Sequence, residues 1–329
     1  MTKGFKKRTG ALVTAVTLFL TMMPTVAFAA DDTIYTDMTY KGISDGSSNR
    51  PYAKFEDALQ KANDGDTIVI KGKAFVNALD EGGVNPLVID KDVKIAGGNN
   101  ARGELYVRAA GIVLDADVVM QNVELNLANK YHNAIFVNGH QFTANNVTRG
   151  SGSREVHLLG GSIGKGTNVT AQMPMPGDTA VMTLEGCEFG NIYAGGMSSS
   201  FDGRTTLAIR NCDLGSVYGS GAKETVPTGG WFDISEPAAP PADEAYRTAG
   251  SVTIETDDSV SKVNGRGAQE VSLTISDAAG HRPMELTGVQ NLAVTSGTAS
   301  IAVLDNDAVL TMSAGAALDV SKLAGTGTD

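Results

Sequence analysis

The chain has 329 residues, of which 42% are hydrophobic, and its formal net charge is −11. An acidic surface repels nucleic acid and anionic lipid, so neither is an expected partner. Two cysteines are too few for disulfides to hold the fold together, as they do in small secreted domains. The length and the hydrophobic content of the chain allow either one large repeat domain or two smaller domains.

Residues 1–29 have the pattern of an export signal. Basic residues precede the apolar run Ala11–Val26, and Ala27–Ala29 supplies the small-x-small pattern of a cleavage site. The alternative is a retained membrane anchor, but the run of about 16–19 apolar residues is short for the ~20 that a span requires. We therefore expect a secreted or cell-surface protein with no membrane span in the mature chain. Its net charge is about −15, because four basic and no acidic residues leave with the signal.

The segment 30–66 differs in pattern from the rest of the mature chain. Apolar residues in Ala53–Ala62 recur at the spacing of one helix face, and Asn63–Asp66 ends that pattern. The β-branched run Thr67–Ile70 follows and predicts a strand. A short amphipathic helix in this place predicts a cap over the open end of a repeat structure.

An internal repeat is the strongest signal in the sequence. The stretch Thr183–Gly196 recurs as Leu207–Gly221 at a period of 25 residues, and Ser251–Gly267 is a weaker third copy. A period of this length indicates a solenoid, in which each unit buries its apolar face against its neighbours. The repeated units are short β-type runs, so a parallel β-helix is expected.

Three sets of residues carry a resemblance to a known family. Asn49–Gly72 resembles the segment that leads into the first coil of bacterial right-handed β-helix proteins of the pectate-lyase-like superfamily. Pro86–Gly98 resembles their next coil, and the Ile/Val-Tyr-x-Gly units resemble coils in surface proteins of Gram-positive bacteria. The resemblance extends over Asn49–Leu323. It implies the fold, but the superfamily includes lyases, hydrolases, adhesins and virulence factors, so it does not imply one activity.

We therefore predict an all-β protein, a right-handed parallel β-helix over residues 67–329 with a short N-terminal capping helix. Coils of about 22–26 residues give roughly ten coils, stacked at ~4.8 Å. The alternative is a pair of β-sandwiches. These need antiparallel hairpins, and their Asn-Gly signal occurs only at Asn138-Gly139 and Asn264-Gly265.

A long insertion at residues 222–249 interrupts the repeat and is rich in proline. Insertions in solenoids gather on one face, which is often the binding face. Aromatic and apolar side chains there and in the preceding loop are the candidate ligand contacts for a glycan or a surface protein. These residues are Trp231, Phe232, Tyr246, Phe201 and Met197. The alternative is that Trp231 and Phe232 fold back and cover an apolar coil edge.

Cys187 and Cys212 occupy the same position in the two copies of the repeat. Stacking on neighbouring coils would place them within the range of a disulfide. A disulfide and a buried pair of reduced thiols both remain open at this point. Metal binding is not expected, because no cysteine or histidine partners lie nearby in sequence.

Catalysis on this fold would require a basic residue with acidic Ca²⁺ ligands for a lyase, or clustered carboxylates for a hydrolase. Candidate sets are Arg154 with His157; Arg204 and Arg210 with Asp202 and Asp213; Asp115 with Asp117; and Glu185 with Asp213. None has the spacing of a known motif. We therefore assign no catalytic residue and no cofactor, and Ca²⁺ enters only under the lyase alternative.

The sequence thus favours an exported bacterial β-helix protein that binds a glycan or a surface protein through loops on one edge. A polysaccharide lyase or glycoside hydrolase on the same fold is one alternative, and a structural stalk is another. Leu318–Leu323 still has the coil pattern, so we expect the chain to be part of a larger surface protein. The sequence does not specify the ligand or the oligomeric state.

Overall fold

The structure is a computed structural model of the chain. It describes residues 32–77, 79–80, 83–98, 101–127, 133–151, 153–163, 173–197, 201, 203–225, 233–237, 250–257, 259–278, 282–305, 308–321 and 323–324. The expected signal, residues 1–29, lies outside this range.

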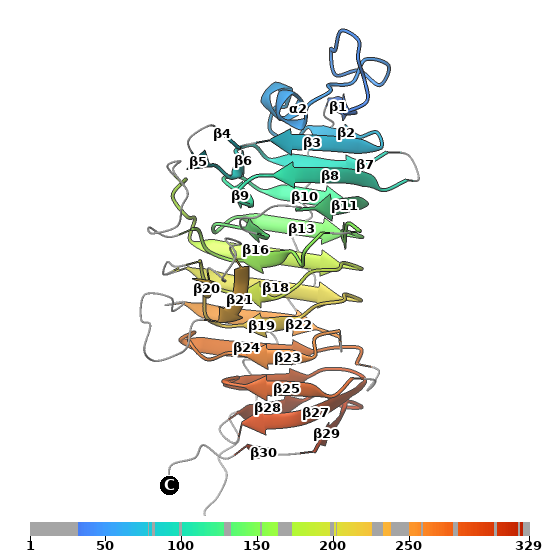
Figure 1. Ribbon diagram of the computed structural model, residues 1–329. Helices are drawn as coiled ribbons and strands as arrows, with labels where there is room; N and C mark the ends of the chain where they lie inside the picture. The colour runs from blue at the N-terminus through green and yellow to red at the C-terminus, as the bar shows by residue number, and fades with distance from the viewer. Residues whose placement is uncertain are drawn as a thin grey trace, which may run out of the picture.

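The described chain forms a parallel β-helix whose coils stack along one axis (Figure 1). Sheet 1 has eleven parallel strands, one from each successive coil. They are β1 (Thr33–Thr36), β2 (Thr67–Ile70), β7 (Val93–Gly97), β10 (Val118–Gln121), β13 (Gln141–Asn145), β16 (Thr179–Glu185), β18 (Arg204–Arg210), β22 (Ser251–Thr256), β24 (Glu270–Ile275), β26 (Asn291–Val294) and β28 (Val309–Met312).

Sheet 2 also has eleven strands and forms a second side of the β-helix. They are β6 (Leu87–Ile89), β9 (Ile112–Leu114), β12 (Ala134–Phe136), β15 (His157–Leu159), β17 (Ile192–Tyr193), β19 (Ser216–Tyr218), β23 (Lys262–Asn264), β25 (Met284–Thr287), β27 (Thr298–Asp305), β29 (Ala317–Val320) and β30 (Leu323–Ala324).

Sheet 3 is shorter, and among the described residues it forms the third side in the N-terminal coils only. Its four strands are β3 (Lys73–Asn77), β8 (Gly103–Arg108), β11 (Val123–Asn126) and β14 (Thr148–Arg149). Two small antiparallel hairpins project from the coils: β4 (Leu79–Asp80) with β5 (Gly83–Val84), and β20 (Ala222–Thr225) with β21 (Asp233–Pro237). Every other strand pairing among the described residues is parallel, which excludes the β-sandwich alternative.

The 25-residue period is confirmed as the stacking repeat. Leu184 pairs with Ile209 in sheet 1, and Tyr193 pairs with Tyr218 in sheet 2. From β1 to β26, alternate residues of the sheet 1 strands point into the lumen of the β-helix and are buried, as in the Thr179–Glu185 strand. Burying one aliphatic side chain such as that of Leu184 stabilises the fold by about 1.5–3 kcal/mol.

Asparagines form the tight corner that follows sheet 1. Asn122, Asn146 and Asn211 all have positive φ, a conformation that asparagine tolerates better than most residues. The side-chain amide of Asn146 donates to the Oδ1 atom of Asn122 on the preceding coil at 2.7 Å. This stacking of side-chain hydrogen bonds holds neighbouring corners in register.

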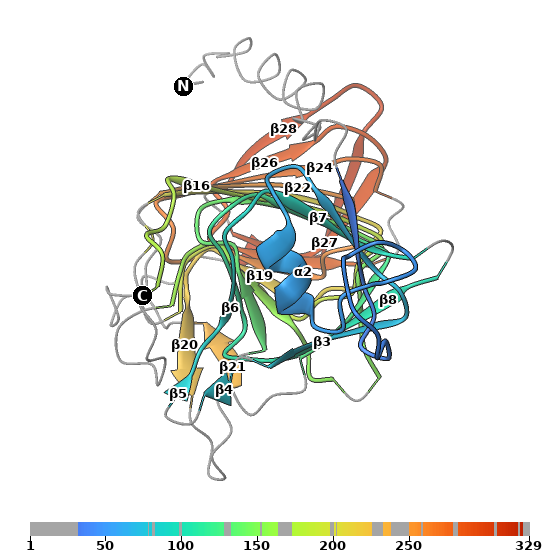
Figure 2. The ribbon, with the colours of Figure 1, turned by 90° about the horizontal axis from the view of Figure 1, so that it is seen from above.

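The helix α2 (Phe55–Lys61) covers the N-terminal end of the lumen, as the sequence predicts (Figure 2). Its side chains Phe55, Ala58 and Leu59 are buried against the first coils. The ammonium of Lys91 donates to the carbonyls of Leu59, Gln60 and Ala62 at its C-terminus, at 3.1, 3.0 and 2.6 Å. β1 adds one strand to sheet 1 from within the N-terminal segment, ahead of the predicted start at residue 67.

Within the part of the chain that the structure describes, no helix has the length and apolar character needed to cross a bilayer.

Candidate functional site

The repeat region carries the most elaborate surface of the molecule, around β15, β17 and β19 of sheet 2. After each of these strands the chain leaves the coil at the same corner. Ile163, Met197 and Ala222 then pair with one another as successive parallel bridges. The excursions that follow therefore start side by side on one flank, and β20–β21 projects from that flank (Figure 2).

Glycine is required where these excursions begin, because neighbouring coils approach closely there. A Cβ atom at Gly160 would lie 2.4 Å from the carbonyl oxygen of Ala194. One at Gly219 would lie 2.5 Å from the carbonyl oxygen of Gly265. The repeated glycines after each tyrosine position are thus explained by backbone contact between coils.

A second apolar cluster lies on the outer side of sheet 2, separate from the lumen. Its buried members are Val113, Ala134, Phe136, Leu159, Ile163, Tyr193, Met197 and Ala222, and Met173 and Tyr218 pack against it. The rings of Tyr193 and Tyr218 stack with centroids 5.1 Å apart and an interplanar angle of 13°. The corner residues Ile163, Met197 and Ala222, together with Met173, thus cover part of the outer face of sheet 2.

The burial of two predicted ligand contacts corrects the sequence analysis. Met197 is 0% exposed and Phe201 is 1% exposed, so neither side chain offers a surface to a ligand. Phe201 packs into the apolar cluster of the lumen, and Met197 packs into the outer apolar cluster. The other three predicted contacts, Trp231, Phe232 and Tyr246, lie outside the described residues.

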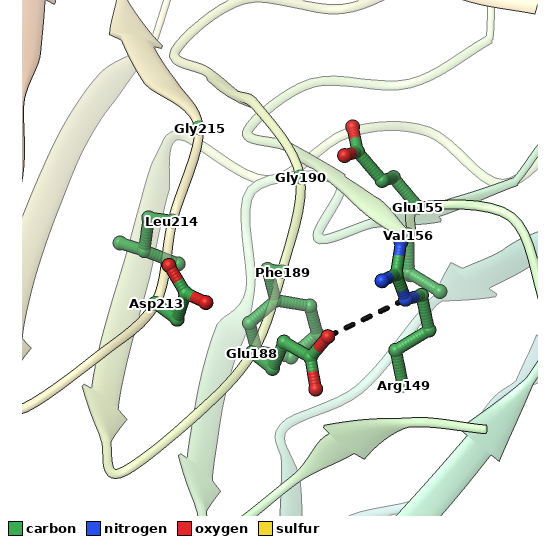
Figure 3. Close-up of a pocket in the computed structure, with 9 residues that line it drawn as sticks. All are labelled: Arg149, Glu155, Val156, Glu188, Phe189, Gly190, Asp213, Leu214 and Gly215. Atoms are coloured by element: carbon green, nitrogen blue, oxygen red, sulfur yellow. Dashed lines mark ion pairs between the residues drawn. The ribbon is translucent and has the colours of Figure 1, made fainter. Parts of the chain in front are cut away.

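A polar pocket of about 160 Å³ opens at the other end of the same three strands (Figure 3). Three successive coils contribute the segments that precede β15, β17 and β19. The lining residues are Arg149, Glu155, Val156, Glu188, Phe189, Gly190, Asp213, Leu214 and Gly215. Val156, Phe189 and Leu214 are buried and form an apolar floor beneath the charged side chains.

The charged groups of the pocket are three carboxylates and one guanidinium. The Nε atom of Arg149 lies 3.4 Å from the Oε1 atom of Glu188, and both side chains are more than one third exposed. Glu188 pairs in register with Asp213 on the next coil. Figure 3 shows Arg149 between Glu155 and Glu188, with Asp213 on the far side of Glu188. The pocket therefore has an excess of negative charge.

Hydrogen bonds join the back of the pocket to the outer apolar cluster. The amide of Asn191 donates to the Nδ1 atom of His157 at 2.9 Å, and its side-chain amide donates to the hydroxyl of Tyr193 at 3.1 Å. A Cβ atom at Gly190 would lie 2.7 Å from the Nδ1 atom of His157. Glycine at this position thus lets the two coils come together behind the pocket.

Cys187 and Cys212 are free, buried and stacked on neighbouring coils next to the pocket. The amide of Cys187 donates to the sulfur of Cys212 at 3.4 Å, and each thiol donates to the carbonyl two residues before it. The hydrogen bond with Cys187, followed by burial, raises the pKa of the Cys212 thiol above its ordinary value. Of the two states that the sequence leaves open, the structure contains the reduced pair.

The structure does not gather the candidate catalytic sets of the sequence analysis into one site. Arg210 lies 2.7 Å from Glu255 and 3.5 Å from Asp277 on sheet 1. Glu185 pairs in register with Arg210, so the acidic neighbour of Asp213 is Glu188, three residues later than the sequence suggests.

The set Asp115 with Asp117 lies at a coil corner. The ring of His140 stands 3.9 Å from Asp115 and 4.0 Å from Asp117. Asp202 lies outside the described residues. Over the described ranges, no group of three or more His, Cys, Asp and Glu side chains is arranged to hold a metal ion.

No family model, no curated protein and no solved structure matches the chain.

Proposed function

We propose that the protein is exported, acts at the bacterial cell surface or after secretion, and binds a glycan at the edge of the coils that contain β15, β17 and β19. Binding, rather than chemistry, is its function in this proposal. We also propose that the chain is a member of the pectate-lyase-like superfamily, which the stacked parallel coils and the N-terminal helix support.

The observation that carries the proposal is the common corner of Ile163, Met197 and Ala222. Three successive excursions begin there side by side, and the same three coils build the pocket at the other end of their sheet 2 strands. A rigid solenoid that gathers its irregular segments on one flank has the organisation of a binding edge.

The chemistry of the pocket favours a neutral glycan over an acidic one. The carboxylates of Glu155, Glu188 and Asp213 accept hydrogen bonds from sugar hydroxyls, and the guanidinium of Arg149 donates them. A polyuronate would meet an excess of like charge in the same place, which opposes its binding. The small volume admits one sugar residue at a time rather than a larger ligand.

A glycan array with the mature chain, residues 30–329, tests this proposal. We expect a neutral glycan to bind, and Glu188→Gln or Arg149→Ala to weaken its binding by about tenfold. The matched control is Glu285→Gln, which removes a carboxylate from an exposed ion pair with Lys262, 3.5 Å away on the same sheet. Equal binding by Glu188→Gln and Glu285→Gln, or no glycan bound at all, would contradict the proposal.

Export has a test of its own. When the full chain is produced in a Gram-positive secretion host, we expect the protein in the medium or on the cell surface to begin at Ala30. Retention of residues 1–29 in the membrane fraction would contradict the export signal.

A retaining glycosidase is the second candidate, because Glu188 and Asp213 occupy adjacent positions on stacked coils. Stacked positions are ~4.8 Å apart at the backbone. The two carboxylates of a retaining enzyme are separated by about 5–5.5 Å. Release of reducing sugar by the wild-type protein, abolished in both Glu188→Gln and Asp213→Asn, would favour this candidate over binding alone.

A further inference from the structure

The outer face of sheet 3 carries an aromatic pair that the binding edge does not include. Phe75 in β3 and Tyr106 in β8 stand in register on neighbouring coils and point away from the lumen. Their ring centroids are 5.5 Å apart and their planes are tilted by 30°. Both side chains are half-buried, so the pair forms an apolar strip that water reaches.

Polar and charged groups border this strip on both sides. The ammonium of Lys73 lies 5.1 Å from the centroid of the Tyr106 ring and 2.6 Å from the carboxylate of Glu104. On the other side, Asn77 and Arg108 pair in register and are exposed. The apolar strip thus lies between groups that can donate and accept hydrogen bonds.

Asn126 lies in the same column on the next coil, and its side chain also points to a ligand. It pairs in register with Tyr106 and is 9% exposed, yet its Oδ1 atom has no hydrogen-bond partner. A buried carbonyl oxygen without a partner costs about 1–3 kcal/mol. Gly150 follows in the same column, and a Cβ atom there would lie 3.1 Å from the Cβ atom of Asn126. Glycine at this position adds no side chain over the amide.

We propose that Phe75, Tyr106 and Asn126 form a second glycan-binding surface, which we name the sheet 3 platform. A sugar residue packs the apolar C–H groups of its ring against Tyr106 and Phe75. One of its hydroxyls donates to the Oδ1 atom of Asn126, which satisfies the buried acceptor. Other hydroxyls interact with Glu104 and Arg108 at the borders.

The charges of the platform select a neutral sugar. Lys73 and Arg108 are opposed by Glu104 and by Glu124, which pairs in register with Glu104. Glu56 adds a third carboxylate at the border, where it accepts a hydrogen bond from the amide of Asn77 at 2.9 Å. No excess of positive charge attracts an anionic ligand, so recognition depends on ring packing and hydroxyl hydrogen bonds. Arg149 of the pocket lies in β14 at the end of sheet 3, but Phe75, Tyr106 and Asn126 lie on the preceding coils and do not line the pocket. The role of the platform therefore does not depend on the proposed binding edge.

Affinity electrophoresis of the mature chain tests the platform, in gels that contain soluble xylan, mannan, galactan or β-glucan, with polygalacturonate as the acidic probe. We expect retardation by at least one neutral polysaccharide. Tyr106→Ala should weaken it about tenfold, whereas Tyr106→Phe keeps the ring and should retain it within about threefold. Asn126→Leu should also weaken it, because the acceptor is lost.

Tyr35→Ala is the matched control, since Tyr35 is a half-buried tyrosine of sheet 1 with Lys71 5.9 Å from its ring centroid. Far-UV circular dichroism and thermal melting establish that each variant is folded. A variant that does not fold is replaced by Phe75→Leu, which keeps an apolar side chain and removes the ring. Equal retardation of the Tyr106→Ala and Tyr35→Ala proteins would overturn the proposal, as would retardation by polygalacturonate alone or by none of the probes.

Combining Tyr106→Ala with Glu188→Gln separates the two sites, because Glu188 lines the pocket and Tyr106 belongs to the platform. We expect Tyr106→Ala to weaken retardation by the same factor with and without Glu188→Gln. If one substitution abolished retardation and the other then had no further effect, there would be one site, which would contradict a separate platform.

Discussion

The N-terminal and C-terminal coils enclose the lumen with different numbers of residues per coil. In the N-terminal coils three sheets surround the lumen, and Ile95 pairs with Met120, 25 residues later. Sheet 3 ends at β14, and in the C-terminal coils Leu273 pairs with Leu292, only 19 residues later. Both sets of coils keep the same parallel pairing in sheets 1 and 2. A stacked β-helix therefore tolerates the loss of one side, provided that its neighbours stay in register.

The two ends differ more strongly than the coils do. Phe55 of α2 is 0% exposed and seals the N-terminal end of the lumen. At the other end of the described coils, Leu310 and Met312 stand in the lumen-facing columns of Leu292 and Val294 but are 46% and 41% exposed. In a linear repeat each coil is stabilised mainly by its neighbours. Local stability should therefore fall from the helix-capped coils towards β28.

The largest expected effect is that of truncating the cap. Phe55→Ala removes a fully buried ring, and we expect it to lower the free energy of unfolding by about 3–5 kcal/mol. Leu310→Ala should lower it by about 1 kcal/mol or less, because nearly half of that residue is exposed. Urea unfolding followed by circular dichroism measures both. Similar losses in the two variants would contradict the difference between the ends.

Hydrogen exchange should reveal the same gradient without mutation. β10 has a strand on either side in sheet 1, whereas β28 pairs with β26 alone. We expect amides of β28 and β29 to exchange at least tenfold faster than those of β10 and β13. Mass spectrometry of peptides measures this exchange. Uniform protection along sheet 1 would show that the coils unfold as one unit and would contradict the expected gradient of local stability.

The thiol pair in the middle coils gives an effect that depends on pH. The pKa of Cys212 is raised in the folded state, so its contribution to stability is complete below the ordinary thiol value of 9.0. As the pH rises above that value, the unfolded chain loses the proton while the folded chain keeps it. Stability then falls, by at most about 1.4 kcal/mol for each pH unit.

Cys212→Ala should remove this part of the alkaline decline. Urea unfolding at pH 8 and pH 10 measures the decline in both proteins, and Cys187→Ala serves as the matched variant of the pair. A decline in Cys212→Ala as steep as in the wild-type protein would show that the folded state does not hold the proton on this thiol.

The smallest expected effect on stability is that of the pocket ion pair. Arg149 and Glu188 are both more than one third exposed, so Arg149→Ala should change the free energy of unfolding by about 1 kcal/mol or less. The same substitution should weaken glycan binding about tenfold. A large loss of stability would mean that Arg149 holds the coils together where sheet 3 ends. The pocket would then have a structural role instead of a binding role.

The sequence is informative wherever a residue type is tied to a repeated position. Tyr193 and Tyr218, with the glycines that follow, are in register as the 25-residue period predicts, because coil-to-coil contact dictates both. The helix was expected over Ala53–Ala62 and forms over Phe55–Lys61. Helical spacing of apolar residues is a local signal and needs no tertiary information.

Other features depend on register and on folding back, which the sequence does not show. Phe75 and Tyr106 come from strands without a common motif, and only the pairing of β3 with β8 brings them together. Met197 looks like an exposed loop residue in the sequence, but it packs into the outer apolar cluster of sheet 2 and is buried. The shortening of the C-terminal coils follows from the loss of sheet 3, which no single residue marks.

Distances between spin labels test the stacking of coils most directly. Lys94, Ala293 and Thr311 belong to one outward column of sheet 1, and seven strand steps separate the first from the second and eight the first from the third. At ~4.8 Å for each step, double electron–electron resonance should give about 34 Å for Lys94 to Ala293 and about 38 Å for Lys94 to Thr311. Distances that do not increase with the number of coils between the labels would contradict the parallel β-helix and both binding surfaces built on it.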